Sequence, residues 1–93
     1  MNFTWPRFDE PIAIDERHSW TALFDSYDQR NENAYYIVTL LEPGRAAGRF
    51  MARIDMGWSG DDWTTAEFVS GVRSRVDWVA RQGKTNTGYT GPL

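Results

Sequence analysis

The residues from position 63 to position 82 alternate between apolar and polar in the rhythm of an amphipathic helix. Plotted at about 100° per residue, one narrow stripe holds four large apolar side chains: Phe68, Val72, Val76 and Val79. Thr64 stands three residues before Glu67, which is the spacing of a capping box at a helix start. Gly83 follows the stripe and is typical of the residue just past a helix end. The pattern predicts a helix over residues 65–82.

Two earlier stretches alternate as strands do. Residues 34–42, AYYIVTLLE, are rich in β-branched and aromatic side chains on both sides, which indicates a central strand. Pro43 and Gly44 then favour a turn. Residues 48–56 form the next predicted strand, whose apolar side chains share one side: Phe50, Ala52, Ile54 and Met56. The residues between them are mostly polar, so we expect one face of the sheet to meet water.

The stretch 18–27, HSWTALFDSY, fits both kinds of structure. Its apolar residues suit one side of a strand, and they also suit the stripe of a short helix. We favour a strand because the stretch is rich in aromatic residues and is followed by the polar run 28–33, which reads as a hairpin loop. The predicted fold is therefore α+β: a three-stranded antiparallel meander followed by one C-terminal helix packed on one sheet face. If residues 18–27 are helical, the order becomes helix, hairpin, helix.

The length of 93 residues fits one domain with a single modest core. Pro6 and Pro11 interrupt residues 1–15, which we expect to lie over the domain as an extended arm. Within this arm, Ile12 and Ile14 alternate and would suit a short edge strand. Residues 84–93 are small and polar, so we expect a loose tail.

The composition argues against catalysis. The chain has no Cys and one histidine, His18, and no serine stands in a recognisable arrangement with a base. We therefore expect no enzyme activity, no metal site and no cofactor. We also expect no targeting segment, because residues 1–11 are charged and interrupted by Pro, and no membrane span, because no apolar run reaches the required length. The missing Cys suits a reducing compartment. These features favour a cytoplasmic protein that does not enter a membrane.

One aromatic residue falls outside the apolar stripe of the predicted helix. Trp78 lies about 130° from the centre of the stripe, with Gly71, Arg75 and Gln82 near it on the helix surface. Trp and Arg are frequent anchors of protein interfaces. These four residues form the predicted protein interface. The alternative is that the aromatic residues of the N-terminal arm cover Trp78.

A second surface is basic. Arg45, Arg49 and Arg53 share the parity of the solvent side of the predicted strand 48–56 and its approach, where a nucleic acid backbone would find a row of cations. We expect first a small non-catalytic module that binds another protein, such as an inhibitor, an immunity or anti-defence protein, or a self-associating accessory protein with a possible homodimer. The alternative is a nucleic-acid-binding domain that uses this outer sheet face.

Overall fold

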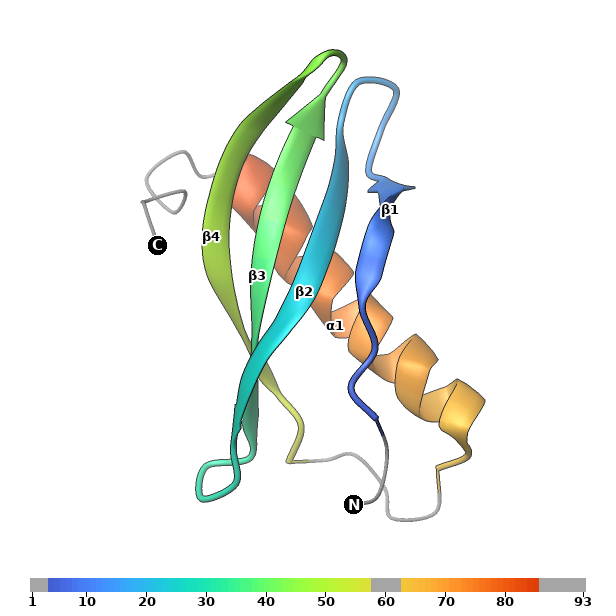
Figure 1. The fold of residues 1–93 in the computed structure, drawn as a ribbon, viewed down its shortest axis with the longest axis vertical. Coiled ribbons are helices and arrows are strands. Elements are labelled where there is room, and N and C mark those ends of the chain that lie inside the picture. Colours follow the sequence, from blue (N-terminus) through green and yellow to red (C-terminus); the bar gives the residue numbers. More distant parts are fainter. Residues whose placement is uncertain (1–3, 58–62, 86–93) are drawn as a thin grey trace.

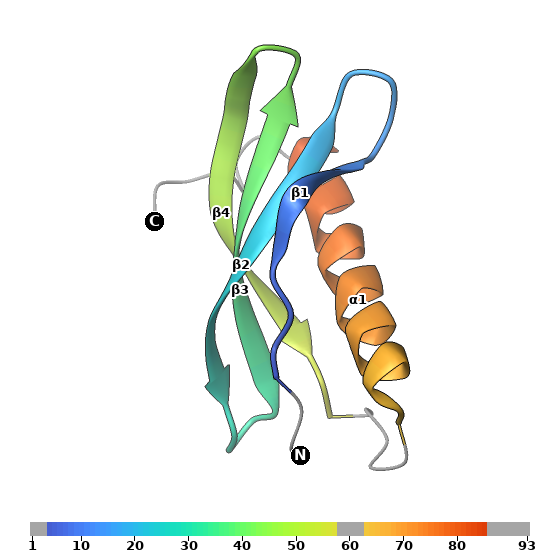
Figure 2. The ribbon, with the colours of Figure 1, turned by 45° about the vertical axis from the view of Figure 1, so that its right-hand side comes forward.

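Four antiparallel strands form one sheet, and one helix crosses a single face of that sheet. The computed structural model describes residues 4–57 and 63–85. The sheet has the order β1-β2-β3-β4, so each strand pairs with its neighbour in sequence (Figure 1). Turning the molecule shows two layers, with α1 on one side of the sheet (Figure 2). The elements are β1 (Phe8–Ala13), β2 (Ser19–Asp28), β3 (Asn33–Glu42), β4 (Arg45–Asp55) and α1 (Thr65–Thr85).

The α+β prediction is confirmed, but the number of strands was wrong. The stretch 18–27 lies in β2 and is a strand, as favoured, so the helical alternative does not hold. The fourth strand is β1, which occupies residues 8–13 of the predicted arm. A short edge strand was expected around Ile12 and Ile14; β1 does lie at the edge, but it begins earlier, at Phe8, and ends before Ile14. Pro11 is compatible with it because β1 lies at the edge of the sheet, and the pairing with β2 shifts between Phe8 and Ile12. This irregular pairing weakens the alternation that a sequence pattern can detect.

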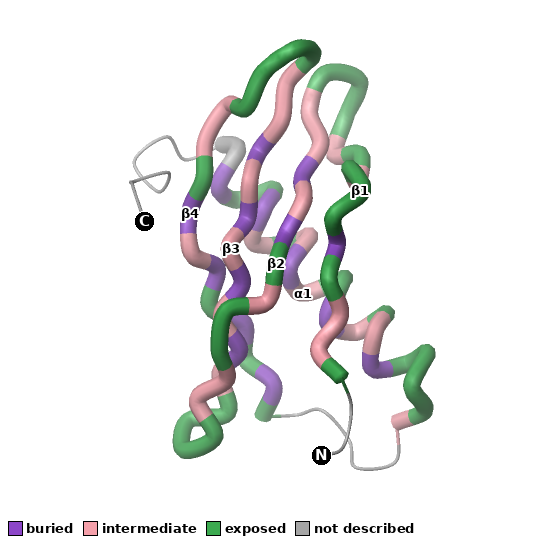
Figure 3. Tube along the Cα trace, viewed as in Figure 1, coloured by how far each residue is buried: buried purple, intermediate pink, exposed green. Residues whose placement is uncertain are grey.

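The core lies between α1 and one face of the sheet. Buried and less buried positions alternate along β3 and β4, as Figure 3 shows by colour. The helix contributes the buried side chains Phe68, Val72, Val76 and Ala80 to the same core. Burying a large apolar side chain contributes roughly 1.5–3 kcal/mol before entropy, so this single layer of contacts holds helix and sheet together.

One polar contact crosses the core. Trp20 of β2 is fully buried, and its indole Nε1 donates a hydrogen bond to Oδ1 of Asp77 on α1 at 2.7 Å. The second oxygen of Asp77 accepts a hydrogen bond from Nε of Arg81, also at 2.7 Å. Because a buried indole N–H needs an acceptor, Asp77 fixes how α1 sits against β2.

The segment before β1 is anchored near the first turn of α1. The Trp5 ring stacks on Phe24 with a centroid distance of 5.1 Å and meets the edge of Phe68 at the same distance. The hydroxyl of Tyr36 donates a hydrogen bond to the carbonyl oxygen of Pro6 at 2.8 Å, and burial raises the pKa of this hydroxyl. The start of the described chain therefore packs against β2, β3 and α1.

The sequence predicted the start of α1 correctly but not its end. At its start, the predicted capping box is present: Thr64 N–H donates to Oε1 of Glu67 at 2.8 Å, and Glu67 N–H donates to Oγ1 of Thr64 at 3.1 Å. At its end, the prediction was wrong, because α1 continues through Gly83 to Thr85. Gly83 instead allows a close approach, since a Cβ built there would lie 2.6 Å from the Phe50 ring. The rest of the predicted tail, residues 86–93, lies outside the described residues.

Replacing Thr64 by Ala should raise the pKa of the Glu67 carboxyl only in part, because Ala keeps the backbone N–H that lowers this pKa most and removes only the contribution of the Thr64 side chain. The backbone N–H of Thr64, with help from its side chain, holds this pKa below the ordinary value in the folded protein. A lowered folded-state pKa stabilises the fold above the unfolded-state pKa, and this contribution is lost as the pH falls through the folded-state pKa. Loss of the N-cap should also cost about 1 kcal/mol. An NMR titration of Glu67 with thermal unfolding would measure both, and an unchanged free energy of unfolding in Thr64→Ala would contradict the hydrogen bond from the Glu67 N–H to the Thr64 hydroxyl.

Candidate functional site

Trp78 is the most exposed large apolar side chain in the described part of the chain. It exposes 65% of its surface, and the only other large apolar residue classed as exposed there is Leu23 on β2, at 41%. Among the described residues before β1, Trp5 packs on Phe24, Tyr27 and Phe68 and not on Trp78. The described part of the arm therefore leaves the Trp78 ring exposed, and residues 1–3 of the predicted arm lie outside the described residues.

Gly71 and Arg75 are already engaged by a residue just before α1. A Cβ at Gly71 would lie 2.6 Å from the Trp63 ring, so this glycine makes room for that ring. The guanidinium carbon of Arg75 lies 5.4 Å from the centre of the same ring, a distance at which cation and ring attract each other. Arg75 also donates from Nη1 to the Gly71 carbonyl and from Nε to the Asp55 carbonyl, both at 3.1 Å. Arg75 thus connects α1 to the end of β4.

The residues that surround Trp78 in the structure therefore differ from those predicted. Gln82 is exposed one turn after Trp78 on α1, as the sequence indicates. Gly71, by contrast, lies under Trp63 and offers no open surface beside Trp78. The neighbours that the sequence analysis missed come from the packing of α1 against β4, a contact that no local pattern reveals.

A shallow groove joins Trp78 to β4. It has a volume of about 310 Å³ and mixes apolar walls with charged rims. Its lining residues come from the last part of β4 and the middle of α1: Arg53, Ile54, Asp55, Arg75, Trp78 and Val79. An apolar side chain from outside would therefore meet Val79 and the Trp78 ring in one place, while Ile54 lies behind them in the core with 2% of its surface exposed.

The predicted row of three arginines is broken by a β-bulge. In the pairing of β3 with β4, Gly48 is opposite Leu40 but Ala46 is opposite Leu41, so Ala47 is an extra residue. The extra residue reverses the parity of the strand and places Arg45 on the other face from Arg49. Nε of Arg45 lies 3.4 Å from Oε2 of Glu42, with which it forms an ion pair. Only Arg49 and Arg53 of the predicted row share the outer face.

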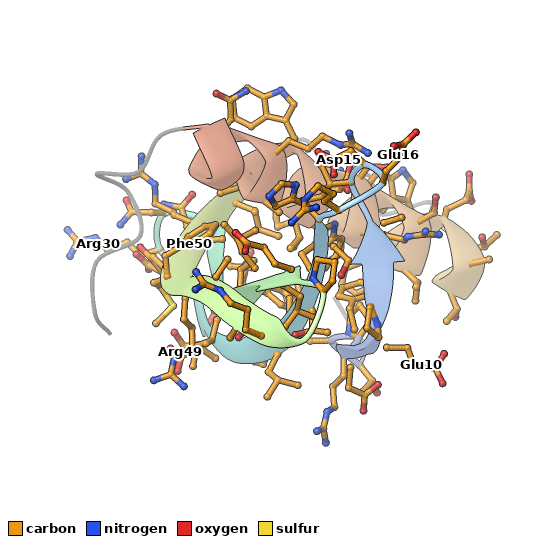
Figure 4. All side chains as sticks on the ribbon, turned by 90° about the horizontal axis from the view of Figure 1, so that it is seen from above. Glu10, Asp15, Glu16, Arg30, Arg49 and Phe50 are labelled. Carbon is orange, nitrogen blue, oxygen red and sulfur yellow. The ribbon has the colours of Figure 1, made fainter. Side chains whose placement is uncertain are left out.

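The outer face of the sheet is mixed in character. Figure 4 shows Arg49 on the side of the sheet away from α1, whereas Phe50 lies between sheet and helix. In the centre, Leu23, Ile37 and Met51 stand opposite one another on three neighbouring strands. Asp28, Asn33 and Asp55 form another row across the same strands, so acids lie on the face that carries the two arginines.

The remaining polar clusters serve the fold. His18 closes the β1–β2 connection: its Nδ1 lies 2.9 Å from Oδ1 of Asp15, and its Nε2 lies 3.9 Å from Oε1 of Glu42. A pocket of about 250 Å³ between β1 and α1 is lined partly by Asp77 and Arg81, which hold Trp20 and each other. Apart from the polar atoms of Trp20 and Tyr36, no polar or charged side chain is buried within residues 4–57 and 63–83. In the described part of the chain, no three His, Asp or Glu side chains gather closely enough to hold a metal ion.

Comparison with models of protein families, with curated proteins and with solved structures finds no match for this chain. In the part of the chain that the structure describes, no helix combines the length and the apolar character that crossing a bilayer requires. Among the surfaces of the described residues, the groove beside Trp78 is the most distinctive.

Proposed function

We propose that this protein is a small non-catalytic module that binds another protein through the surface around Trp78. An inhibitor, an immunity or anti-defence protein, and a self-associating accessory protein all fit this description. The observation that carries the proposal is the exposure of 65% of Trp78 beside a groove whose walls include Ile54 and Val79. Exposing so large a ring to water is unfavourable unless a partner covers it.

The chemistry of the groove also favours a protein partner. Trp, Tyr and Arg are the residues most enriched among interface anchors, and Trp78 lies in one groove with Arg53 and Arg75. The Arg75 guanidinium is held in place by Asp55 and Trp63, so little conformational freedom is lost when a partner packs against it.

The outer face gives weaker support to the nucleic-acid alternative. The bulge at Ala47 removes Arg45 from the row, and the ion pair with Glu42 engages its charge. Asp28 and Asp55 share the face with Arg49 and Arg53, so a phosphate backbone along the strands would meet acids as well as cations. The proposal of a protein partner therefore ranks first.

Replacing Trp78 by Ala should weaken binding of the natural partner by about 2 kcal/mol, or roughly 30-fold, as loss of an anchor Trp does. The free energy of unfolding should change by less than about 0.5 kcal/mol because the ring is mostly in water. Affinity capture from the native cell with mass spectrometry would identify the partner, and calorimetry would measure the affinity of each variant.

Leu23→Ala is the matched control, because Leu23 is exposed on the opposite face. It should leave the affinity unchanged, and a loss of affinity with Leu23→Ala instead of Trp78→Ala would place the interface on the outer sheet face.

The salt dependence of binding distinguishes a protein partner from a nucleic acid. Protein binding should depend weakly on salt, whereas nucleic-acid binding would weaken steeply, with a slope reduced by about one unit in Arg49→Ala or Arg53→Ala.

A further inference from the structure

On β4, every second residue directs its backbone N–H and C=O groups away from β3. The N–H of Met56 donates to the Glu32 carbonyl at 2.8 Å, so at Met56 the backbone faces the β3 side. Along an antiparallel strand this direction alternates from residue to residue. Counting back from Met56 up to the bulge, the N–H and C=O groups of Asp55, Arg53, Met51 and Arg49 therefore point outward. The bond from Arg75 to the Asp55 carbonyl agrees independently, since α1 reaches that carbonyl from outside the ladder.

Within the described residues, three of these four positions have no partner for their outward backbone groups. Arg75 occupies the carbonyl of Asp55, but the structure shows no described residue bonded to the outward backbone groups of Arg49, Met51 and Arg53. A strand placed beside β4 would lie about 4.8 Å away and would find donors and acceptors over this length. Such pairing is how many domains bind extended peptides.

The groove lies on the α1 side of this open edge. Side chains of an added strand alternate between the two faces of the sheet. Those on the α1 side would enter the groove and contact Val79 and Trp78. Trp78 is thus placed to cover the apolar half of a fifth strand, which gives its exposure in the free protein a physical reason.

The charges of Arg49 and Arg53 determine which kind of strand can pair with the β4 edge. Arg49 and Arg53 point to the outer face on either side of Met51. If a second copy paired through its own β4 about Met51, Arg49 would stand opposite Arg53 twice, and like charges directly opposite one another are destabilising. Acidic side chains at those positions would instead form favourable pairs.

We propose that the β4 edge binds an extended segment of a partner protein as a fifth strand, with acidic side chains on the outer face and apolar side chains in the groove beside Trp78. This inference rests on the proposed protein-binding function and names the mode and the chemistry of the partner. The open backbone of residues 49–53, the apolar groove and the two arginines each select one property of the bound segment.

Two synthetic peptides test the charge pattern. One has about seven residues in which Glu alternates with Val, and the other carries Lys in place of each Glu. We expect the Glu peptide to bind the full chain measurably in NMR titrations, with shifts at residues 49–53 and at the Trp78 indole, and the Lys peptide to bind at least tenfold more weakly. The double variant Arg49→Glu/Arg53→Glu should reverse this preference. An unchanged preference, or no binding of the Glu peptide, would overturn the proposal.

The backbone is tested with Met51→Pro. Proline removes the outward N–H of this edge residue without removing a hydrogen bond to β3, so the fold should survive. Met51→Thr keeps the N–H and is the matched control. We expect Met51→Pro to weaken the Glu peptide at least tenfold and Met51→Thr to change the affinity less than twofold; equal affinities would overturn strand addition.

Binding of the natural partner to the variants distinguishes strand addition from the more general protein-binding function. A captured partner that needs Trp78 but binds Met51→Pro normally would refute strand addition and leave the binding function in place. A partner indifferent to both changes would refute both. Self-association abolished by Met51→Pro would identify the fifth strand as a second copy and overturn the acidic partner.

Discussion

Replacing Phe50 by Ala is expected to lower the free energy of unfolding by about 4 kcal/mol. The ring is 98% buried, with 2% of its surface exposed, and it lies between β4 and the last turns of α1. Removing it leaves a cavity that the rigid sheet cannot fill by relaxing. Urea unfolding followed by circular dichroism would measure the loss, and a change below about 1 kcal/mol would contradict this packing.

A second substitution makes the Phe50 prediction more specific. A Cβ at Gly83 would lie 2.6 Å from the Phe50 ring, so Gly83→Ala should destabilise the protein by about 1–3 kcal/mol through overpacking. In the Phe50→Ala background the ring is absent, and Ala is favoured over Gly inside a helix by about 1 kcal/mol. Gly83→Ala should then stabilise. If Gly83→Ala changed the free energy of unfolding in the same direction in both backgrounds, Gly83 and Phe50 would not be in contact.

The prediction that Gly83 ends the helix failed because the role of this glycine depends on a distant residue: Gly83 lies inside α1, where it makes room for the Phe50 ring. A glycine after an apolar stripe is typical of a helix end, and the sequence offers no sign that Phe50 approaches α1 there. The start of α1 was predictable because its capping box involves only Thr64 and Glu67, which are neighbours in the chain. Local signals thus sufficed where partners are close in sequence, and they failed where a contact joins distant segments.

Trp5→Ala is expected to lower the free energy of unfolding by about 3 kcal/mol, the lower end for a large aromatic residue because Trp5 is half-buried. Its ring has centroid distances of 5.1 Å to Phe24, Tyr27 and Phe68, so one side chain joins the arm, β2 and α1. Chemical denaturation of the purified variants would measure the effect.

Trp78→Ala is the control for this prediction, because it removes the same kind of side chain from an exposed position. It should change the unfolding free energy by less than about 0.5 kcal/mol. If the two substitutions destabilise equally, then the arm is not anchored by Trp5 or Trp78 is covered.

The candidate surface was predicted in part. Helical periodicity alone placed Trp78 away from the apolar stripe, and the structure leaves it exposed. The groove residues Arg53 and Ile54 could not be assigned, because they reach Trp78 only through the crossing of α1 over the sheet. The arginine row failed at Arg45 because one extra residue at Ala47 reverses parity. Gly48 beside it is a local sign of such a bulge, since a glycine inside a strand often marks one, but it does not show which residue is the extra one.

The position of α1 after all four strands has a consequence for the protein during its synthesis. The strands pair in the order in which they leave the ribosome, so each hairpin can form as soon as its second strand appears. The inner face of the sheet, however, waits for the helix. From Asp55 at the end of β4 to Ala80, the last buried alanine of α1, synthesis takes roughly 1–5 s at about 5–20 residues per second. Until α1 has been made and has packed, no described element covers this apolar face of the sheet, which is the kind of surface that chaperones bind.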